Sequence, residues 1–213
     1  SENAKEECYF CEERKDANAV CDNGHYVCDT CHAADALEAI RRICHATRET
    51  DMILLFQEIR SHEAIPMHGP EYHAIVPAVI LATYRNLGGA VTEGMLETAI
   101  TRGSRVMVGS CAFAGACGAA SGAGVAVSLL LKANPLTPTQ RRQVMIFVNE
   151  ISMEIASHTA ARCCQRDAWI ALAKTAELSG KLLPIKLRAD AEMVCEQFEQ
   201  NSHCSGNQFC QHC

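Results

Sequence analysis

Aromatic residues make up only 5% of this 213-residue chain, and no long run of like charge interrupts it. The lack of a basic run, with a formal net charge of -6, excludes a large nucleic-acid footprint and a polybasic membrane patch. Strict alternation of apolar and polar residues is missing outside the first 32 residues, which argues against a sheet-based fold. Hydrophobic residues reach 48%, enough to bury an ordinary core without disulfides.

The first residues, 1–7, are polar and acidic, so the sequence shows no secretory signal. We therefore expect a cytoplasmic protein in a reducing compartment, where cysteines bind metals or do redox chemistry more often than they pair. Disulfides stay open as an alternative, because an export signal can be removed. The longest apolar stretch, 116–131, is short for a membrane span and begins with Ala, Gly and Ser, so no membrane partner is expected.

Cysteine, in contrast, is abundant: the chain has 14, and 12 of them fall into three groups along the sequence. Thiolates at such spacings hold soft or borderline metals. The groups are N-terminal (Cys8, Cys11, Cys28, Cys31), central (Cys111, Cys117, Cys163, Cys164) and C-terminal (Cys195, Cys204, Cys210, Cys213).

The N-terminal group forms two C-x2-C pairs, Cys8–Cys11 and Cys28–Cys31, which predict one tetrahedral zinc site of ribbon or treble-clef type. A turn at 22–24 separates the two pairs. Three further donors lie nearby and either replace a cysteine ligand or are ordinary loop residues: Cys21, His25 and His32.

From residue 33 onward, apolar residues recur at helical spacing. Caps and turns predict helices after Asp51, over 71–86 with a kink at Pro77, after Thr92, over 116–131, 139–157 and 167–177, and last over 185–198. The expected fold is mainly α, a helical bundle around the small-residue helix 116–131. The expected domains are a zinc module (1–32), a helical domain with a central metal site (33–190) and a metal-binding tail (191–213).

Cys111 and Cys117 lie where the small-residue helix begins. A helix N-terminus offers free N–H groups that favour a thiolate, although a cysteine in this position is often just a small buried residue. A second pair, Cys163-Cys164, precedes another helix and can supply ligands to one site or to two.

Three motifs in order resemble those of iron–sulfur L-serine dehydratases and L-cysteine desulfidases: Ile75-Val-Pro-Ala-Val-Ile80, Ala-Cys117-Gly-Ala-Ala-Ser-Gly and Cys163-Cys-Gln-Arg-Asp-Ala168. The resemblance covers roughly residues 68–175. It implies an all-helical domain with a [4Fe-4S] cluster that has three cysteine ligands and one open iron. Cys117 and Cys163 would be ligands; the third position falls on Ser152, so Cys164 or Cys111 would substitute, and Cys164 is the ligand we expect.

His68-Gly-Pro-Glu-Tyr-His73, together with the small-residue helix and the cysteine pair, is also similar to an uncharacterised cysteine-rich domain of archaea and anaerobic bacteria. That domain is sometimes fused to radical S-adenosylmethionine enzymes and brings no known activity.

Polar residues near these motifs are the candidates for catalysis. His68, Glu71 and His73 could supply acid–base groups, although His68 and His73 could equally be metal ligands, and Cys111 is a further catalytic candidate. Arg162 and Arg166 could bind a substrate carboxylate. Loop capping and solvated helix flanks are the alternatives for the histidines and arginines.

The C-terminal group, Cys195, Cys204, Cys210 and Cys213, lies among polar residues that cannot form an apolar core, so a zinc ion or an iron–sulfur cluster is expected to order it. The tail could instead deliver Cys213 to the central site, or be a disordered thiol-rich segment.

Two functions follow from these patterns. The first is a [4Fe-4S] lyase, desulfidase or sulfur-transfer enzyme acting on a small polar or sulfur-containing substrate. The alternative is a non-catalytic zinc or iron–sulfur accessory protein that docks a redox or radical S-adenosylmethionine partner. A homodimer is an option for either. The paired cysteines and His68, Glu71 and His73 should share one pocket if the chain is an enzyme.

Overall fold

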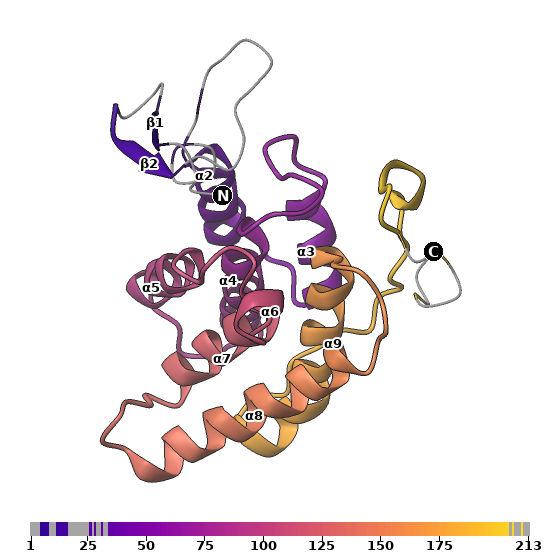
Figure 1. Cartoon of the computed structure of the whole chain (residues 1–213). Helices are drawn as coiled ribbons and strands as arrows, with labels where there is room; N and C mark the ends of the chain where they lie inside the picture. The colour runs from indigo at the N-terminus through magenta and orange to yellow at the C-terminus, as the bar shows by residue number, and fades with distance from the viewer. Residues whose placement is uncertain are drawn as a thin grey trace.

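A computed structural model describes residues 5–8, 12–16, 26, 28, 31, 34–204, 206 and 210 of the chain. The fold is mainly helical, as predicted, with a small hairpin near the N-terminus (Figure 1). The described elements are β1 (Lys5–Glu7), β2 (Arg14–Asp16), α2 (Ala34–Ala46), α3 (Met52–Arg60), α4 (Glu71–Asn86), α5 (Glu93–Ser104), α6 (Ser110–Phe113), α7 (Gly118–Leu130), α8 (Pro138–Ala156), α9 (Cys164–Leu182) and the 3-10 helix η1 (Phe198–Gln200).

Side-chain caps set the start of two helices. Asp51 accepts hydrogen bonds from the backbone N–H groups of Ile53 and Leu54 at the start of α3, and Thr92 accepts one from Met95 at the start of α5. Each bond satisfies an N–H group that the first helical turn leaves unpaired. Both caps confirm predictions from the sequence.

Helices α4 and α7 form the centre of the bundle. Helix α4 is buried over nearly its whole length and packs against α2, α3, α5, α7 and α9. Helix α7, the predicted small-residue helix, packs against α4, α5, α8 and α9. Its glycines permit this close approach: a β carbon at Gly122 would lie 2.9 Å from both the carbonyl oxygen of His73 and the ring of Pro77.

Pro77 has a local consequence within α4. Because proline lacks an N–H group, the carbonyl of His73 has no helical donor four residues on. Gly103 of α5 and Gly122 of α7 both lie against this carbonyl oxygen. A β carbon on either glycine would clash with it. Two neighbouring helices therefore approach α4 most closely at the turn that proline interrupts.

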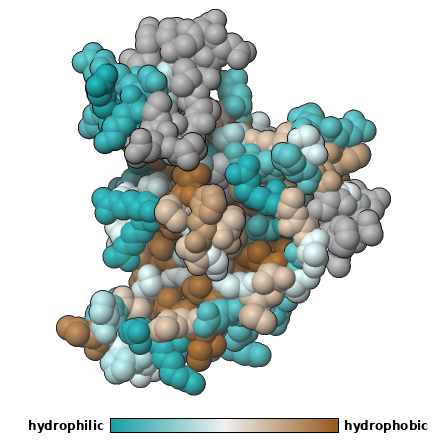
Figure 2. All heavy atoms as spheres, in the orientation of Figure 1, coloured by the Kyte–Doolittle hydropathy of each residue, from teal (hydrophilic) through white to brown (hydrophobic). Residues whose placement is uncertain are grey.

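An aromatic cluster fills the core between α3, α4 and α9. The ring centroid of Phe56 lies 6.0 Å from Tyr72 and 6.2 Å from Trp169, both in tilted or edge-on geometry. Some apolar side chains remain outside: on the face in Figure 2, hydrophobic surface gathers over the α6–α7 region, where Met107, Val108 and Phe113 are exposed. Within the described part of the chain, no helix has the length and apolar character needed to cross a membrane.

The segment after α9 corrects one prediction, because residues 185–197 are not helical and only η1 follows them. Its backbone forms hydrogen bonds with the start of α3 instead. The Arg188 carbonyl accepts a bond from the Met52 N–H, and the Asp51 carboxylate accepts bonds from the N–H groups of Asp190 (2.6 Å) and Ala191 (3.3 Å). The hydroxyl of Ser179 likewise accepts one from Leu187. These bonds hold the segment against the start of α3 in an extended path.

Candidate metal centres

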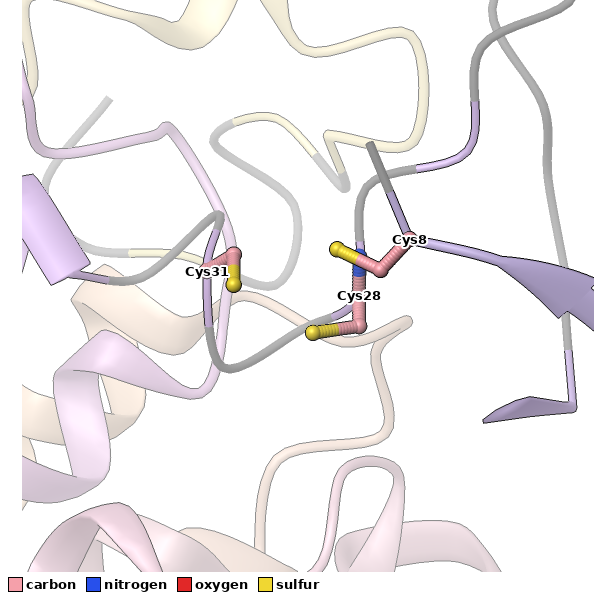
Figure 3. Close-up of side chains that lie close together, drawn as sticks. All are labelled: Cys8, Cys28 and Cys31. Atoms are coloured by element: carbon pink, nitrogen blue, oxygen red, sulfur yellow. The ribbon is translucent and has the colours of Figure 1, made fainter. Parts of the chain in front are cut away.

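The N-terminal hairpin brings three cysteines together. The sulfurs of Cys8, Cys28 and Cys31 all lie within 4.8 Å of one another, close enough to hold one metal ion. Figure 3 shows the three side chains meeting between the end of β1 and the segment that leads into α2. Cys8 and Cys28 are fully buried. Cys11, the fourth predicted ligand, lies outside the described residues, as do Cys21, His25 and His32.

Backbone bonds position this cluster locally. Strands β1 and β2 pair antiparallel, and Cys8 continues the pairing through its N–H bond to the Glu13 carbonyl (3.0 Å). The Cys28 N–H donates to the Cys8 sulfur at 3.3 Å, and the Lys15 ammonium lies 3.8 Å from the Cys28 sulfur. A backbone N–H group and a cation thus lie beside sulfurs of the cluster, and a metal binds such sulfurs as thiolates.

A second set of donors lines a pocket that we call the seam pocket, between the loop before α4, the start of α9 and the C-terminal segment. Its room is about 20 Å³, enough for a single water-sized species. Four cysteines and two histidines line it: Cys163, Cys195, Cys204, Cys210, His68 and His203. The C-terminal segment thus folds back onto the central region, one of the arrangements considered from the sequence; Cys213 itself lies outside the described residues.

Cys163 is held by the helix that follows it. It is the N-cap of α9, and its sulfur accepts a hydrogen bond from the Arg166 N–H at 3.5 Å. Burial raises the pKa of the Cys163 thiol, while this N–H and the Arg166 charge oppose the rise. A bound metal cation would stabilise the thiolate further, because coordination deprotonates a thiol.

His68 offers the seam pocket a neutral imidazole. Both ring nitrogens are buried, and among the described residues neither makes a hydrogen bond of normal geometry. Burial lowers the pKa of His68, and the neighbouring Asn201 side chain partly offsets this. A neutral imidazole with buried nitrogens can ligate a metal or accept a proton.

Cys164 does not line the seam pocket but lies beside Gly69 of the same loop. Burial raises its pKa to about 11, against the lowering effect of the Gly69 N–H. Glu71 is also buried, and its carboxylate occupies the space where Gly69 would carry a β carbon. A glycine at 69 therefore lets the loop, Glu71 and Cys164 pack together beside the seam pocket.

Cys117 and His73 meet at the start of α7, and neither lines the seam pocket. The His73 ring covers Gly118, the first residue of α7, and its Nδ1 lies 3.3 Å from the Val106 carbonyl. Burial raises the pKa of Cys117 and lowers that of His73. Cys111 is exposed on α6. The predicted polar residues therefore divide between two places, with His68 and Glu71 near Cys163 and Cys164, and His73 near Cys117.

The two predicted substrate-binding arginines differ in their surroundings. Arg162 is exposed. Arg166 is buried and committed within the protein: its Nε and Nη2 lie 3.1 and 2.9 Å from Asp167 Oδ1, and Nη2 donates to the Ala161 carbonyl. Burial raises the pKa of Asp167, and Arg166 opposes that rise.

Single-ion geometry is present at one place in the part of the chain that the structure describes. No trio of donors there, apart from Cys8, Cys28 and Cys31, has its ligand atoms all within 4.8 Å. The predicted cluster ligands Cys117, Cys163 and Cys164, and the described tail residues Cys195, Cys204 and Cys210, are therefore spaced more widely. Iron–sulfur clusters tolerate wider spacing than a single ion because their cysteines bind different irons.

Some residues of the seam had no prediction attached. Asp167 stands in the Cys-Cys-Gln-Arg-Asp motif, where the sequence predicts only the start of a helix; in the structure its charge raises the pKa of Cys117, Cys163 and Cys164. Gln165 and Asn201 line the pocket or contact His68. Gln165 stands inside the Cys163–Ala168 motif, although the sequence assigns it no role, whereas only tertiary packing reveals Asn201.

A family of unknown function, DUF5714, matches residues 40–213. The match includes every residue of the seam pocket and begins after the N-terminal cysteine cluster. No curated protein and no solved structure matches the chain. The resemblance to iron–sulfur dehydratases and desulfidases, and the taxonomic association, therefore gain no support from relatives and stay hypotheses.

Proposed function

The chain belongs to this family of unknown function, DUF5714, and we propose that it is a metalloenzyme with a thiolate-bound iron–sulfur centre in the seam pocket. The supporting observation is the convergence of Cys163, His68 and three cysteines of the C-terminal segment on one pocket. The reaction class that fits is elimination, desulfuration or sulfur transfer on a small polar or sulfur-containing molecule.

A [4Fe-4S] cluster is larger than the room of about 20 Å³ in the seam pocket, so binding it would require the C-terminal segment to move outward. Three thiolates would then hold the cluster and leave one iron open as a Lewis acid for a hydroxyl, thiol or sulfide leaving group. Cys163 is the first ligand we assign, because α9 fixes its sulfur. Two of Cys195, Cys204 and Cys210 complete the set. This shifts the cluster from the ligands expected from sequence, Cys117 and Cys164, which do not line the pocket.

His68 would serve as the acid–base group beside the cluster. Its pKa is lowered by burial, so the ring is neutral near pH 7 and able to accept a proton. Glu71, packed on Gly69, holds the loop that carries His68 and is assigned a positioning role.

A second candidate function is a zinc accessory protein. The observation that favours it is the room of about 20 Å³ in the seam pocket, which suits one ion better than a cluster. In this case both cysteine sites order the chain for a redox or radical-enzyme partner. The N-terminal cluster is assigned zinc in both candidates, because zinc is the common ion of paired C-x2-C sites.

Anaerobic purification with metal and acid-labile sulfide analysis separates the two. The wild type should contain roughly four irons, four sulfides and one zinc per chain. Cys163→Ser should lose the iron and sulfide and keep the zinc, whereas the matched variant Cys28→Ser should lose the zinc and keep the iron. Two zincs with no sulfide would instead establish the accessory protein. Single serine substitutions at Cys195, Cys204 and Cys210 identify the remaining ligands.

A further inference from the structure

Arg60, the last residue of α3, is a half-buried cation. Its Nε and Nη2 atoms are buried, and neither has a hydrogen-bond partner among the described residues. The same residues supply no ion pair to it, in contrast to Arg166, which pairs with Asp167. Arg60 as a whole is half-buried, and two buried nitrogens without acceptors are unfavourable, because buried polar groups in native proteins usually have a partner.

Gln165 of α9 presents the complementary feature nearby. This residue of α9 is 4% exposed, and its Oε1 atom is buried without a hydrogen-bond donor among the described residues. An unpaired acceptor and an unpaired cation therefore occur in one neighbourhood. Each would be satisfied by a ligand that brings an anionic group and a donor.

Both residues line the same open cleft of about 600 Å³ between α3, α9 and the C-terminal segment. This volume is in the range of small-molecule sites. Gln57, Ser61 and Gln197 add polar lining. The cleft shares Gln165, Trp169 and Gln197 with the seam pocket, so a molecule bound here would lie next to the proposed metal centre.

Three carboxylates also line the cleft: Glu58, Glu192 and Glu196. Within the described chain, none of them forms an ion pair with Arg60. Their negative charge disfavours a polyanion such as inorganic phosphate. A singly charged carboxylate, whose planar oxygens match the guanidinium fork, fits the cleft better.

We propose that this cleft binds a small monocarboxylate that also carries a hydrogen-bond donor, with Arg60 pairing the carboxylate and Gln165 accepting from the donor. If the cleft is the substrate site of the enzyme, this inference rests on the proposed function. If it is only a binding site, the inference rests on the cleft alone. It replaces Arg162 and Arg166 as carboxylate-binding groups, because Arg162 is exposed and Arg166 is already paired.

Saturation-transfer NMR on the anaerobically purified full chain tests the site with three matched probes. L-Lactate has both the carboxylate and a hydroxyl donor, propionate lacks the donor, and lactamide lacks the charge. We expect lactate to bind most tightly, propionate more weakly and lactamide not at all. Arg60→Met should weaken lactate binding by at least about tenfold, the size of one charge-assisted hydrogen bond. Gln165→Leu should remove the preference for lactate over propionate.

Stability measurements distinguish a binding role from a structural one. Without ligand, Arg60→Met should unfold at the same temperature as the wild type or higher, because it removes an unpaired buried charge. Arg141→Met, an exposed arginine on α8, is the matched control and should change neither stability nor binding. Arg60→Lys keeps the charge without the fork and should bind lactate more weakly while remaining folded.

Equal binding of lactate and lactamide to the wild type would overturn the inference, and so would a large drop in the unfolding temperature of Arg60→Met. The proposed function fails separately, if the wild type holds neither iron nor sulfide. Lactate binding that depends on Arg60 in such a protein would leave a carboxylate site without a catalytic metal.

Discussion

The two cysteine sites differ in how far along the chain their ligands are collected. The N-terminal cluster uses Cys8, Cys28 and Cys31, held by a hairpin and short-range bonds, and its sulfurs lie within 4.8 Å of one another. The seam pocket combines Cys163 with Cys195, Cys204 and Cys210, and its donors are more widely spaced. The first site needs only its local loop to fold, whereas the second needs the helical bundle to be folded.

The largest effect on stability should come from removing Trp169, which lines the seam pocket. Trp169 is 2% exposed, packs on Phe56 and lines the pocket, so Trp169→Ala should lower the free energy of unfolding by about 3–5 kcal/mol. Urea unfolding followed by circular dichroism measures this. Metal analysis should show the seam centre lost and the N-terminal metal retained. Trp169→Phe, the milder control, should keep both metals; seam metal persisting in Trp169→Ala would contradict the dependence on packing.

A smaller effect should follow from loosening the C-terminal segment at its anchor. Asp51→Ala removes the α3 cap and the acceptor for the N–H groups of Asp190 and Ala191, and should cost about 2–4 kcal/mol. Affinity for the seam metal should fall as well, while zinc at the N-terminal cluster is unchanged.

Asp51→Asn separates the two roles of this side chain. One oxygen still caps α3, but the amide group cannot accept from Asp190. Stability should therefore recover in part and seam-metal affinity should not. If Asp51→Asn binds the metal as well as the wild type, the anchor is irrelevant to the seam.

Acidification should produce a more modest change in the helical bundle only. Burial lowers the pKa of His73, so the unfolded chain binds a proton more readily than the folded one below about pH 6.5. The free energy of unfolding should then decrease as pH falls below that value, with His68 contributing in the same direction. His73→Gln, which can still donate to the Val106 carbonyl, should flatten the pH profile measured by thermal unfolding. An unchanged profile would show that His73 takes up its proton as readily in the folded state as in the unfolded state.

The smallest effect on the bundle is expected from Cys28→Ser. This variant should lose the N-terminal metal, because one of three clustered sulfurs is gone, yet leave the unfolding midpoint of the helices unchanged. Far-ultraviolet circular dichroism during urea titration is the measurement. A shifted midpoint would show that both sites belong to one cooperative unit.

Features that depend on neighbouring residues, such as helix caps and helix ends, could be predicted from the sequence. Asp51 and Thr92 were expected as caps and act as caps, because a cap depends only on the next three residues. Helix α4 begins and ends as predicted, at 71 and 86, since a Gly-Pro pair precedes it and a Gly-Gly pair follows it. The zinc-type pairs were equally visible, and three of their four cysteines do meet.

Features that depend on distant segments were not readable. Residues 185–198 have helical spacing, yet Asp51, more than a hundred residues away, takes the N–H groups that a helix would use. The pairing of Arg166 with Asp167 and the isolation of Arg60 depend equally on what packs around them. The domain boundaries expected at 32 and 190 stay predictions.

The wide spacing of the seam donors along the chain also sets an order in time. Ribosomes add roughly 5–20 residues per second. All three sulfurs of the N-terminal cluster are present once Cys31 has been synthesised. Cys210, in contrast, follows Cys163 by 47 residues, and their synthesis takes roughly 2–9 s at that rate. For those seconds the nascent chain presents an incomplete, thiol-bearing pocket, so oxygen exposure during synthesis should harm the seam centre more than the N-terminal one.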